Sequence, residues 1–135
     1  MAGRVVRVCP PRDFDFSNLS TGTETVVVAE RIDASQYDTI DVIVRVHTDS
    51  TISSGSIAVQ VVSDGYTTDD PSVDFFSDTI GQGTTLSGSL SAGDMSVESL
   101  TSSDGIGAMV AVRVVGSAGS GVTARLSIDL AMKSC

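Results

Sequence analysis

The stretch YDTIDVIVRVHT, residues 37–48, is the clearest strand in the sequence. Its apolar and polar residues alternate. One face collects Ile40, Val42, Val44 and Val46, and the other collects Asp41, Arg45 and His47. Successive side chains of a β-strand point to opposite faces of its sheet, so this period of two is typical of a strand with one buried face. The stretch therefore predicts a strand that covers an apolar core.

A second apolar stretch follows closely and predicts a return strand. Residues 56–63 (SIAVQVVS) again alternate, and residues 53–55 (SSG) before them are typical of a turn. We expect this strand to form a hairpin with residues 37–48. Upstream, residues 24–32 (ETVVVAERI) predict another strand.

The N-terminal stretch predicts a short strand at residues 4–9 (RVVRVC). Pro10 and Pro11 should stop it, because proline cannot donate a hydrogen bond to a β-ladder. We expect the chain from there to residue 22 to be irregular. Within it, Phe14 and Phe16 are two positions apart and are expected to close one end of the core.

The C-terminal third alternates over two long stretches. Residues 106–115 (IGAMVAVRVV) and 122–132 (VTARLSIDLAM) both follow a period of two, and the Gly- and Ser-rich residues 116–121 separate them. This pattern predicts a second hairpin with long arms. The pattern of residues 77–103 is weaker, and we expect two or three short strands there.

Together these stretches predict about eight or nine short strands. Turn signals separate them, which is typical of an all-β, antiparallel β-sandwich or jelly roll. The length of 135 residues suits a single domain. We expect residues 1–22 to form an N-terminal strand and extended arm, and residues 23–135 to form the sandwich.

Composition and charge agree with this class and exclude others. Val, Thr, Ser, Gly and Asp are abundant, and these residues suit strands and turns. The net charge of −9 opposes direct binding to nucleic acid. The apolar runs are too short for a signal peptide or a transmembrane helix. We therefore expect synthesis in the cytoplasm and no membrane partner.

Residues that could carry catalysis are scarce. His47 is the only histidine, and no nucleophile or phosphate-binding motif accompanies it. We interpret it as an exposed strand residue and predict that the protein is not an enzyme. Cys9 and Cys135 are either two separate thiols, which we favour, or a disulfide that joins the ends of the chain. One histidine and two distant cysteines do not predict a zinc site.

An acidic stretch offers a weak candidate for calcium. The carboxylates of DGYTTDDPSVD could act as oxygen ligands, although their spacing is not that of an EF-hand; they are Asp64, Asp69, Asp70 and Asp74. A solvated turn is the favoured interpretation, so we expect no cofactor. Sugar-binding sandwiches use exposed aromatic platforms, and this chain has no Trp and only two tyrosines. Tyr37 is expected to cover the core edge, and Tyr66 lies in the acidic stretch.

One region resembles a known class of proteins. Residues 30–46 (ERIDASQYDTIDVIVRV), the return strand at 56–63 and the loop closing at Pro71 and Phe75 resemble small β-sandwich virion proteins of tailed phages or phage-like particles. These are head-decoration, cement or tail-associated proteins. The resemblance covers about a third of the chain and is one of pattern, and the family has no catalytic residues to transfer.

The resemblance and the composition together predict a structural role. We expect a virion or particle-surface protein that self-associates, as a trimer or higher oligomer, and coats a major shell or tail protein. The N-terminal segment is the expected interface, because an arm can add to the sheet of a neighbour. Its candidate residues are Arg4, Val5, Val6, Arg7, Val8, Phe14 and Phe16. The alternative is a carbohydrate- or calcium-dependent binding module of an adhesin or secreted protein.

Overall fold

The computed structural model describes residues 3–64, 76–101 and 109–134. The described residues form eight strands and no helix. In chain order the strands are β1 (Gly3–Asp15), β2 (Thr23–Asp33), β3 (Thr39–Val46), β4 (Ser50–Asp64), β5 (Phe76–Leu90), β6 (Met95–Thr101), β7 (Met109–Ser117) and β8 (Thr123–Lys133). The predicted all-β class is therefore confirmed. Of the two or three short strands expected in residues 77–103, the described part of this stretch contains the short β6 and most of β5, which is a long strand of 15 residues.

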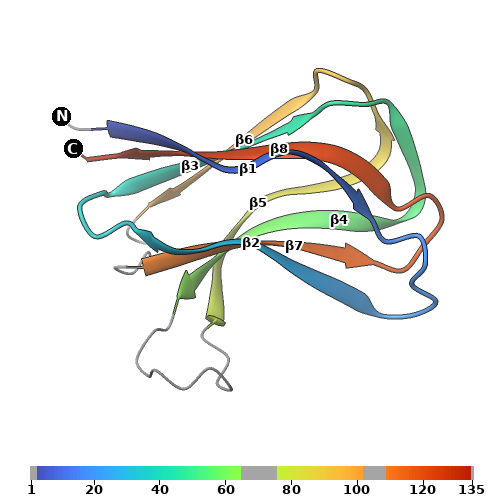
Figure 1. Cartoon of the computed structure of the whole chain (residues 1–135), viewed down its shortest axis with the longest axis horizontal. Coiled ribbons are helices and arrows are strands. Elements are labelled where there is room, and N and C mark those ends of the chain that lie inside the picture. Colours follow the sequence, from blue (N-terminus) through green and yellow to red (C-terminus); the bar gives the residue numbers. More distant parts are fainter. Residues whose placement is uncertain (1–2, 65–75, 102–108, 135) are drawn as a thin grey trace.

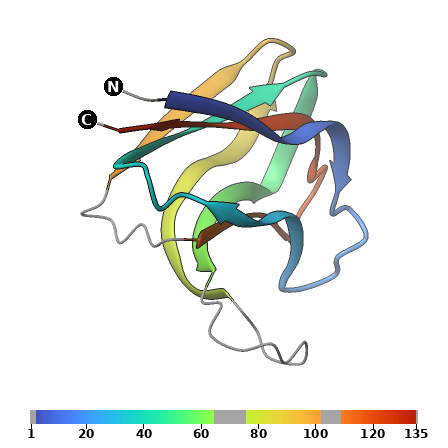
Figure 2. The same ribbon diagram turned by 60° about the vertical axis from the view of Figure 1, so that its left-hand side comes forward.

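The strands form two four-stranded sheets that face each other (Figure 1). Sheet A has the order β1-β8-β3-β6, and sheet B has the order β2-β7-β4-β5. The first strand thus pairs with the last, the second with the seventh, the third with the sixth and the fourth with the fifth. This nesting is that of one long antiparallel hairpin rolled into two sheets, which is a jelly roll. Both ends of the chain lie side by side, because Gly3 pairs with Lys133 (Figure 2).

The two predicted hairpins are wrong. β3 lies in sheet A and β4 in sheet B, and β7 and β8 are divided between the sheets in the same way. Each connection is therefore an arch across the core rather than a turn within a sheet. Alternation shows which side chains face the core, but strands on opposite sides of one core give the same pattern. The predicted turn at residues 53–55 falls inside β4, where the register with β5 shifts between Ile52 and Ile57.

The prolines do not stop the first strand, contrary to the prediction. β1 continues through Pro10 and Pro11 to Asp15. The register with β8 shifts between Cys9 and Arg12, so the prolines sit in a β-bulge. β1 is also an edge strand, and proline is tolerated in edge strands and bulges because no ladder hydrogen bond is lost there.

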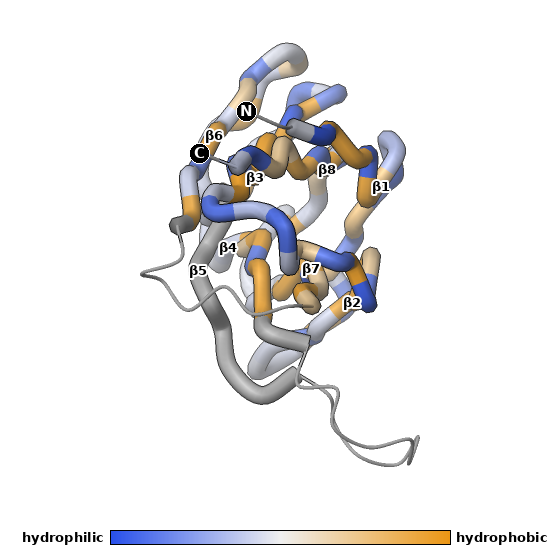
Figure 3. Tube along the Cα trace, turned by 90° about the vertical axis from the view of Figure 1, so that its left-hand side faces the viewer, coloured by the Kyte–Doolittle hydropathy of each residue, from blue (hydrophilic) through white to orange (hydrophobic). Residues whose placement is uncertain are grey.

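The core lies between the two sheets (Figure 3). The apolar face predicted for residues 37–48 is confirmed, because all four of its members are buried. The same holds for alternate residues of the strands on both sides, so that the largest fully buried side chains are Ile40, Ile57, Leu126, Ile128, Leu130 and Met132. A core built mainly from Val, Ile and Leu explains how the chain folds with few aromatic residues.

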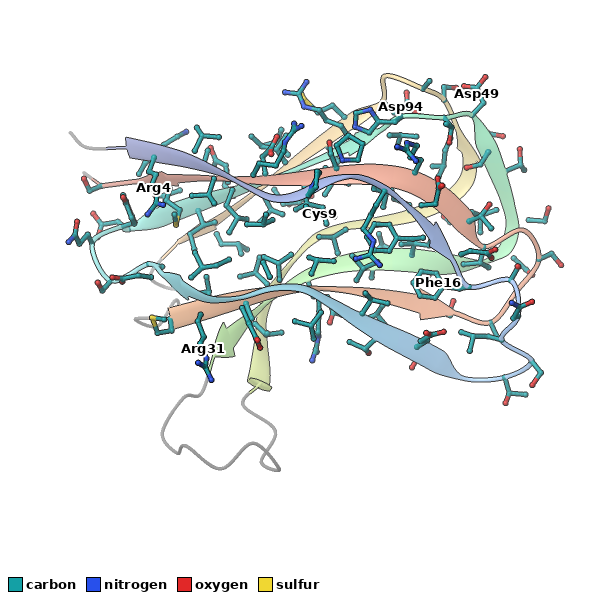
Figure 4. All side chains as sticks on the ribbon, viewed as in Figure 1. Arg4, Cys9, Phe16, Arg31, Asp49 and Asp94 are labelled. Carbon is teal, nitrogen blue, oxygen red and sulfur yellow. The ribbon has the colours of Figure 1, made fainter. Side chains whose placement is uncertain are left out.

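Phe14 and Phe16 close one end of this core, as predicted. Both are buried, and Phe16 lies between the sheets (Figure 4). The ring of Phe16 covers the backbone of Gly116 so closely that a β-carbon there would lie 2.1 Å from a ring carbon. The buried ring of Phe16 therefore leaves room only for glycine at position 116.

Candidate functional site

The outer face of sheet A carries the most developed polar network among the described residues. Asp129 in the central strand β8 is 8 % exposed although it faces away from the core. Arg7 of β1 donates to both of its carboxylate oxygens, from Nε at 2.9 Å and from Nη2 at 3.2 Å. This bidentate pair joins the N-terminal strand to β8 and raises the pKa of Arg7 through its hydrogen bond with Asp129.

A second ionic contact lies near the termini. Asp41 of β3 accepts hydrogen bonds from Lys133 Nζ and from Ser99 Oγ, both at 2.7 Å. The Lys133 contact lowers the pKa of Asp41, and the Ser99 contact adds to this effect. The network thus ties β6, β3 and β8 together across the outer face of sheet A.

This contact predicts a dependence of stability on pH. Because the pKa of Asp41 is lower in the folded state, its ionised form stabilises the fold above the ordinary carboxyl pKa, and this stabilisation is lost as the pH falls through the lowered value. We expect Asp41→Asn to cost about 1 kcal/mol at neutral pH. In urea titrations the difference from the parent chain should shrink steadily on acidification.

A matched carboxylate serves as the control. Asp13 is 76 % exposed and lies 3.3 Å from Arg125. Asp13→Asn should cost less than about 0.5 kcal/mol at neutral pH. A cost of Asp41→Asn that stays constant down to strongly acidic pH would show that the ionic contact is not its cause.

Three large apolar side chains are exposed on the two edge strands of sheet A. Val5 of β1 is 70 % exposed, and Met95 and Val97 of β6 are 56 % and 47 % exposed. Val5 was predicted as an interface residue, whereas Met95 and Val97 were not. The weak pattern of residues 77–103 gave no clear signal for them. In the structure, Leu100 of the same strand is buried, and the odd-numbered residues face away from it.

The structure separates the predicted interface residues into exposed and covered ones. Arg4, Val5 and Arg7 are exposed, and the first strand to which they belong pairs with β8 of the same chain. Val6 and Val8 are half-buried and pack against the core. Phe14 and Phe16 belong to the core, and Arg12 lies over the ring of Phe14, 4.7 Å from its centre. The use of residues 1–22 as an arm between subunits stays a prediction.

His47 is exposed, as predicted, and it lies beside a serine that sequence reasoning missed. Its Nε2 lies 2.8 Å from Ser127 Oγ, although the two residues are 80 positions apart. Ser127 is fully buried, so its hydroxyl offers no accessible nucleophile to a substrate. We interpret the pair as a hydrogen bond that joins the end of β3 to β8.

The cysteines, the calcium candidates and the tyrosines are the remaining residues that the sequence analysis considered. Cys9 is a buried free thiol whose pKa is raised by burial. Cys135 lies outside the described residues. Of the calcium candidates, Asp64 ends β4, and the other three lie outside the described residues, as does Tyr66. Tyr37 packs against the core, as expected.

Two hollows occur at the surface of the described residues. One of about 180 Å³ opens beside β6, and its walls are mostly apolar; they comprise Val44, Val46, Leu86, Leu90, Asp94, Met95 and Ser96. The other, of about 290 Å³, is more polar and lies between the end of β1 and the start of β4; its walls include Asp13, Asp15, Asp49 and Arg125. Within the described ranges, no group of three or more His, Cys, Asp or Glu side chains could hold a metal ion. No helix formed by these residues could cross a lipid bilayer.

Comparisons with known proteins identify the fold rather than a family. No protein-family model matches the chain, and a search of curated proteins finds no match. Among solved structures, the crystal structure of the infectious bursal disease virus VP2 subviral particle is similar, with a TM-score of 0.55 and 14 % identity over 97 % of this chain and 31 % of that chain. The structure of the Gx strain of the same virus is similar over the same shares of both chains, with a TM-score of 0.53 and 14 % identity.

The likeness extends over almost the whole of this chain. The chain spans about a third of the length of the viral chains that it matches. At 14 % identity, the likeness shows a shared fold. The fold described above is therefore shared with a segment of VP2 from this subviral particle.

Proposed function

We propose that this chain is a non-enzymatic structural protein of a viral or virus-like particle, where it self-associates, coats a shell, or does both. The observation that carries the proposal is the jelly-roll topology, β1-β8-β3-β6 facing β2-β7-β4-β5, and its likeness to VP2 of a subviral particle over 97 % of this chain. The jelly roll also occurs in unrelated proteins such as lectins and cupins, so the surface of this chain must support the assignment.

The surface supports an assembly role in two ways. Its exposed large apolar residues on sheet A lie on the two edge strands, where a neighbouring chain could cover them. The net charge of −9 keeps a protein that is made in many copies soluble until it assembles. A head-decoration, cement or tail-associated protein of a tailed phage is the specific role that the sequence resemblance favours. Its partners would then be other copies of this chain, in trimers or larger oligomers, and a major shell or tail protein.

Sedimentation velocity of the purified chain over a wide concentration range tests this function. We expect a trimer or larger species at high concentration, with the same distribution in calcium and in EDTA. A monomer at every concentration that also fails to bind assembled shells would overturn the proposal. A monomer whose thermal stability rises with calcium or a sugar would instead support the binding-module alternative.

A further inference from the structure

The two edges of sheet A differ in charge. β1 forms one edge and β6 the other (Figures 2 and 3). Three of the eight cationic residues of the chain lie on β1, at Arg4, Arg7 and Arg12. The opposite edge carries Glu98 in β6 and Asp94 directly before it. β1 also carries Asp13 and Asp15, but both lie beyond its bulges, and Arg7 is already paired with Asp129. Before the bulges β1 carries no acidic residue, so Arg4 gives this part of the edge a positive charge, whereas the opposite edge is acidic.

Each edge contains one regular stretch that is suited to pairing. In β1, residues 3–7 pair with β8 without a register shift, whereas the bulges begin after Arg7. In β6, residues 95–101 pair with β3 without a shift. Each stretch also presents exposed apolar surface, at Val5 in β1 and at Met95 and Val97 in β6. Bulges and prolines hinder edge pairing, so only the first half of β1 offers a straight edge.

The strand directions fit a contact between unlike edges. All pairings in sheet A are antiparallel, so β1 and β3 run one way and β8 and β6 run the other. When a second copy lies beside the first with its sheet A in the same orientation, its β1 is antiparallel to β6 of the first. The ladder of one sheet could thus continue into the next.

A single register satisfies both the apolar and the charged residues. Placing Val5 of one copy opposite Val97 of another puts Arg4 opposite Glu98, because residue numbers run in opposite directions along the two strands. Val5 and Val97 both face outward from sheet A. Arg4 lies on the same, inner face of β1 as Val6, which packs against the core. Glu98 lies on the inner face of β6, because it pairs in register with the buried Val42. Directly opposed residues of an antiparallel pair lie on the same face of the sheet. Val5 and Val97 therefore meet on the outer face, and Arg4 and Glu98 meet on the inner face.

We propose that a second copy of this chain binds head to tail at these edges, with residues 3–7 of one copy paired antiparallel to residues 95–99 of the next. Contacts between like edges are disfavoured, since two β1 edges would oppose arginines and two β6 edges would oppose carboxylates. A contact between unlike edges repeats from copy to copy and either closes into a ring or extends into a filament. This inference rests on the proposed function and specifies its interface.

Disulfide trapping tests the register. Within one chain, Val5 and Val97 are three strand spacings apart, about 14 Å, which is too far for a disulfide. In a Cys135→Ser background, mild oxidation of Val5→Cys/Val97→Cys should therefore give a ladder of linked dimers, trimers and larger species on a non-reducing gel. The matched variant Val5→Cys/Ser96→Cys places the second thiol on the opposite face of β6 and should give no ladder.

Charge reversal tests the same contact independently of cysteine chemistry. Glu98→Arg or Arg4→Glu alone should raise the concentration needed for assembly about tenfold or more, because each places like charges opposite each other. The double variant Arg4→Glu/Glu98→Arg restores an opposite pair and should assemble within about threefold of the parent chain. Circular dichroism of each variant confirms that the fold is retained.

The outcomes separate this interface from the proposed function. If the parent chain assembles but the Val5/Val97 pair gives no ladder and both single reversals assemble normally, the head-to-tail contact is overturned and the structural function stands. If the parent chain never assembles, alone or on a shell, both are overturned. A ladder together with rescue by the double reversal establishes the contact.

Discussion

Replacing Gly116 with alanine is expected to destabilise the domain by about 2–3 kcal/mol, an effect typical of overpacking a core. A β-carbon at this position would lie 2.1, 2.2 and 2.4 Å from three ring carbons of Phe16. Phe16 is buried between the sheets and has little room to move, so either the ring or β7 must shift. Urea denaturation at a protein concentration too low for assembly measures the loss of unfolding free energy.

A double-mutant cycle isolates the clash. Phe16→Ala alone should cost about 3–4 kcal/mol, as for other buried aromatic side chains. Adding Gly116→Ala to that variant should cost almost nothing more, because the ring is gone. As a control, Gly93→Ala introduces a β-carbon with no atom within 4 Å, so only its positive φ of 95° opposes the change and about 1 kcal/mol is expected. Additive effects of Gly116→Ala and Phe16→Ala would show that the ring does not cover this glycine.

Shortening Leu130 to alanine is expected to cost about 3–4 kcal/mol. Leu130 is fully buried in β8, the strand that pairs with both β1 and β3, and its neighbours in register are Val6 and Val42. The cavity therefore opens in the middle of sheet A, where the strands on both sides limit collapse. The free energy of unfolding from urea titration gives the loss.

The matched change on the same sheet is Val5→Ala. Val5 is 70 % exposed, so the loss should be below about 0.5 kcal/mol when measured on the monomer. Similar losses for Leu130→Ala and Val5→Ala would contradict the assignment of the inner and outer faces of sheet A.

The sequence predicts the faces of the strands well and their partners poorly. Alternation correctly assigned the buried residues of β3, and the alternating stretches that became β4, β7 and β8 also supply core residues, because burial of one face depends on local periodicity. The pairing depends on which side of the core a strand occupies. Connections as short as residues 47–49 and 118–122 suit an arch as well as a turn, so the prediction of both hairpins was wrong.

The candidate assembly surface was predicted in part for a similar reason. Val5 and its arginine neighbours were recognisable because they lie in one short N-terminal stretch. The bond between Arg7 and Asp129 joins residues 122 positions apart, and only the pairing of the first strand with the last brings them together. Met95 and Val97 lie within the weakly patterned residues 77–103, so their outward direction became clear only from the register with β3.

Electron microscopy of the purified 135-residue chain at high concentration is the most direct test of its role as a particle-building protein. We predict rings, filaments or closed particles made of regularly repeated subunits, and their loss in the Glu98→Arg variant. A field of separate small domains at every concentration, with none attached to added shells, would contradict a structural role in a particle.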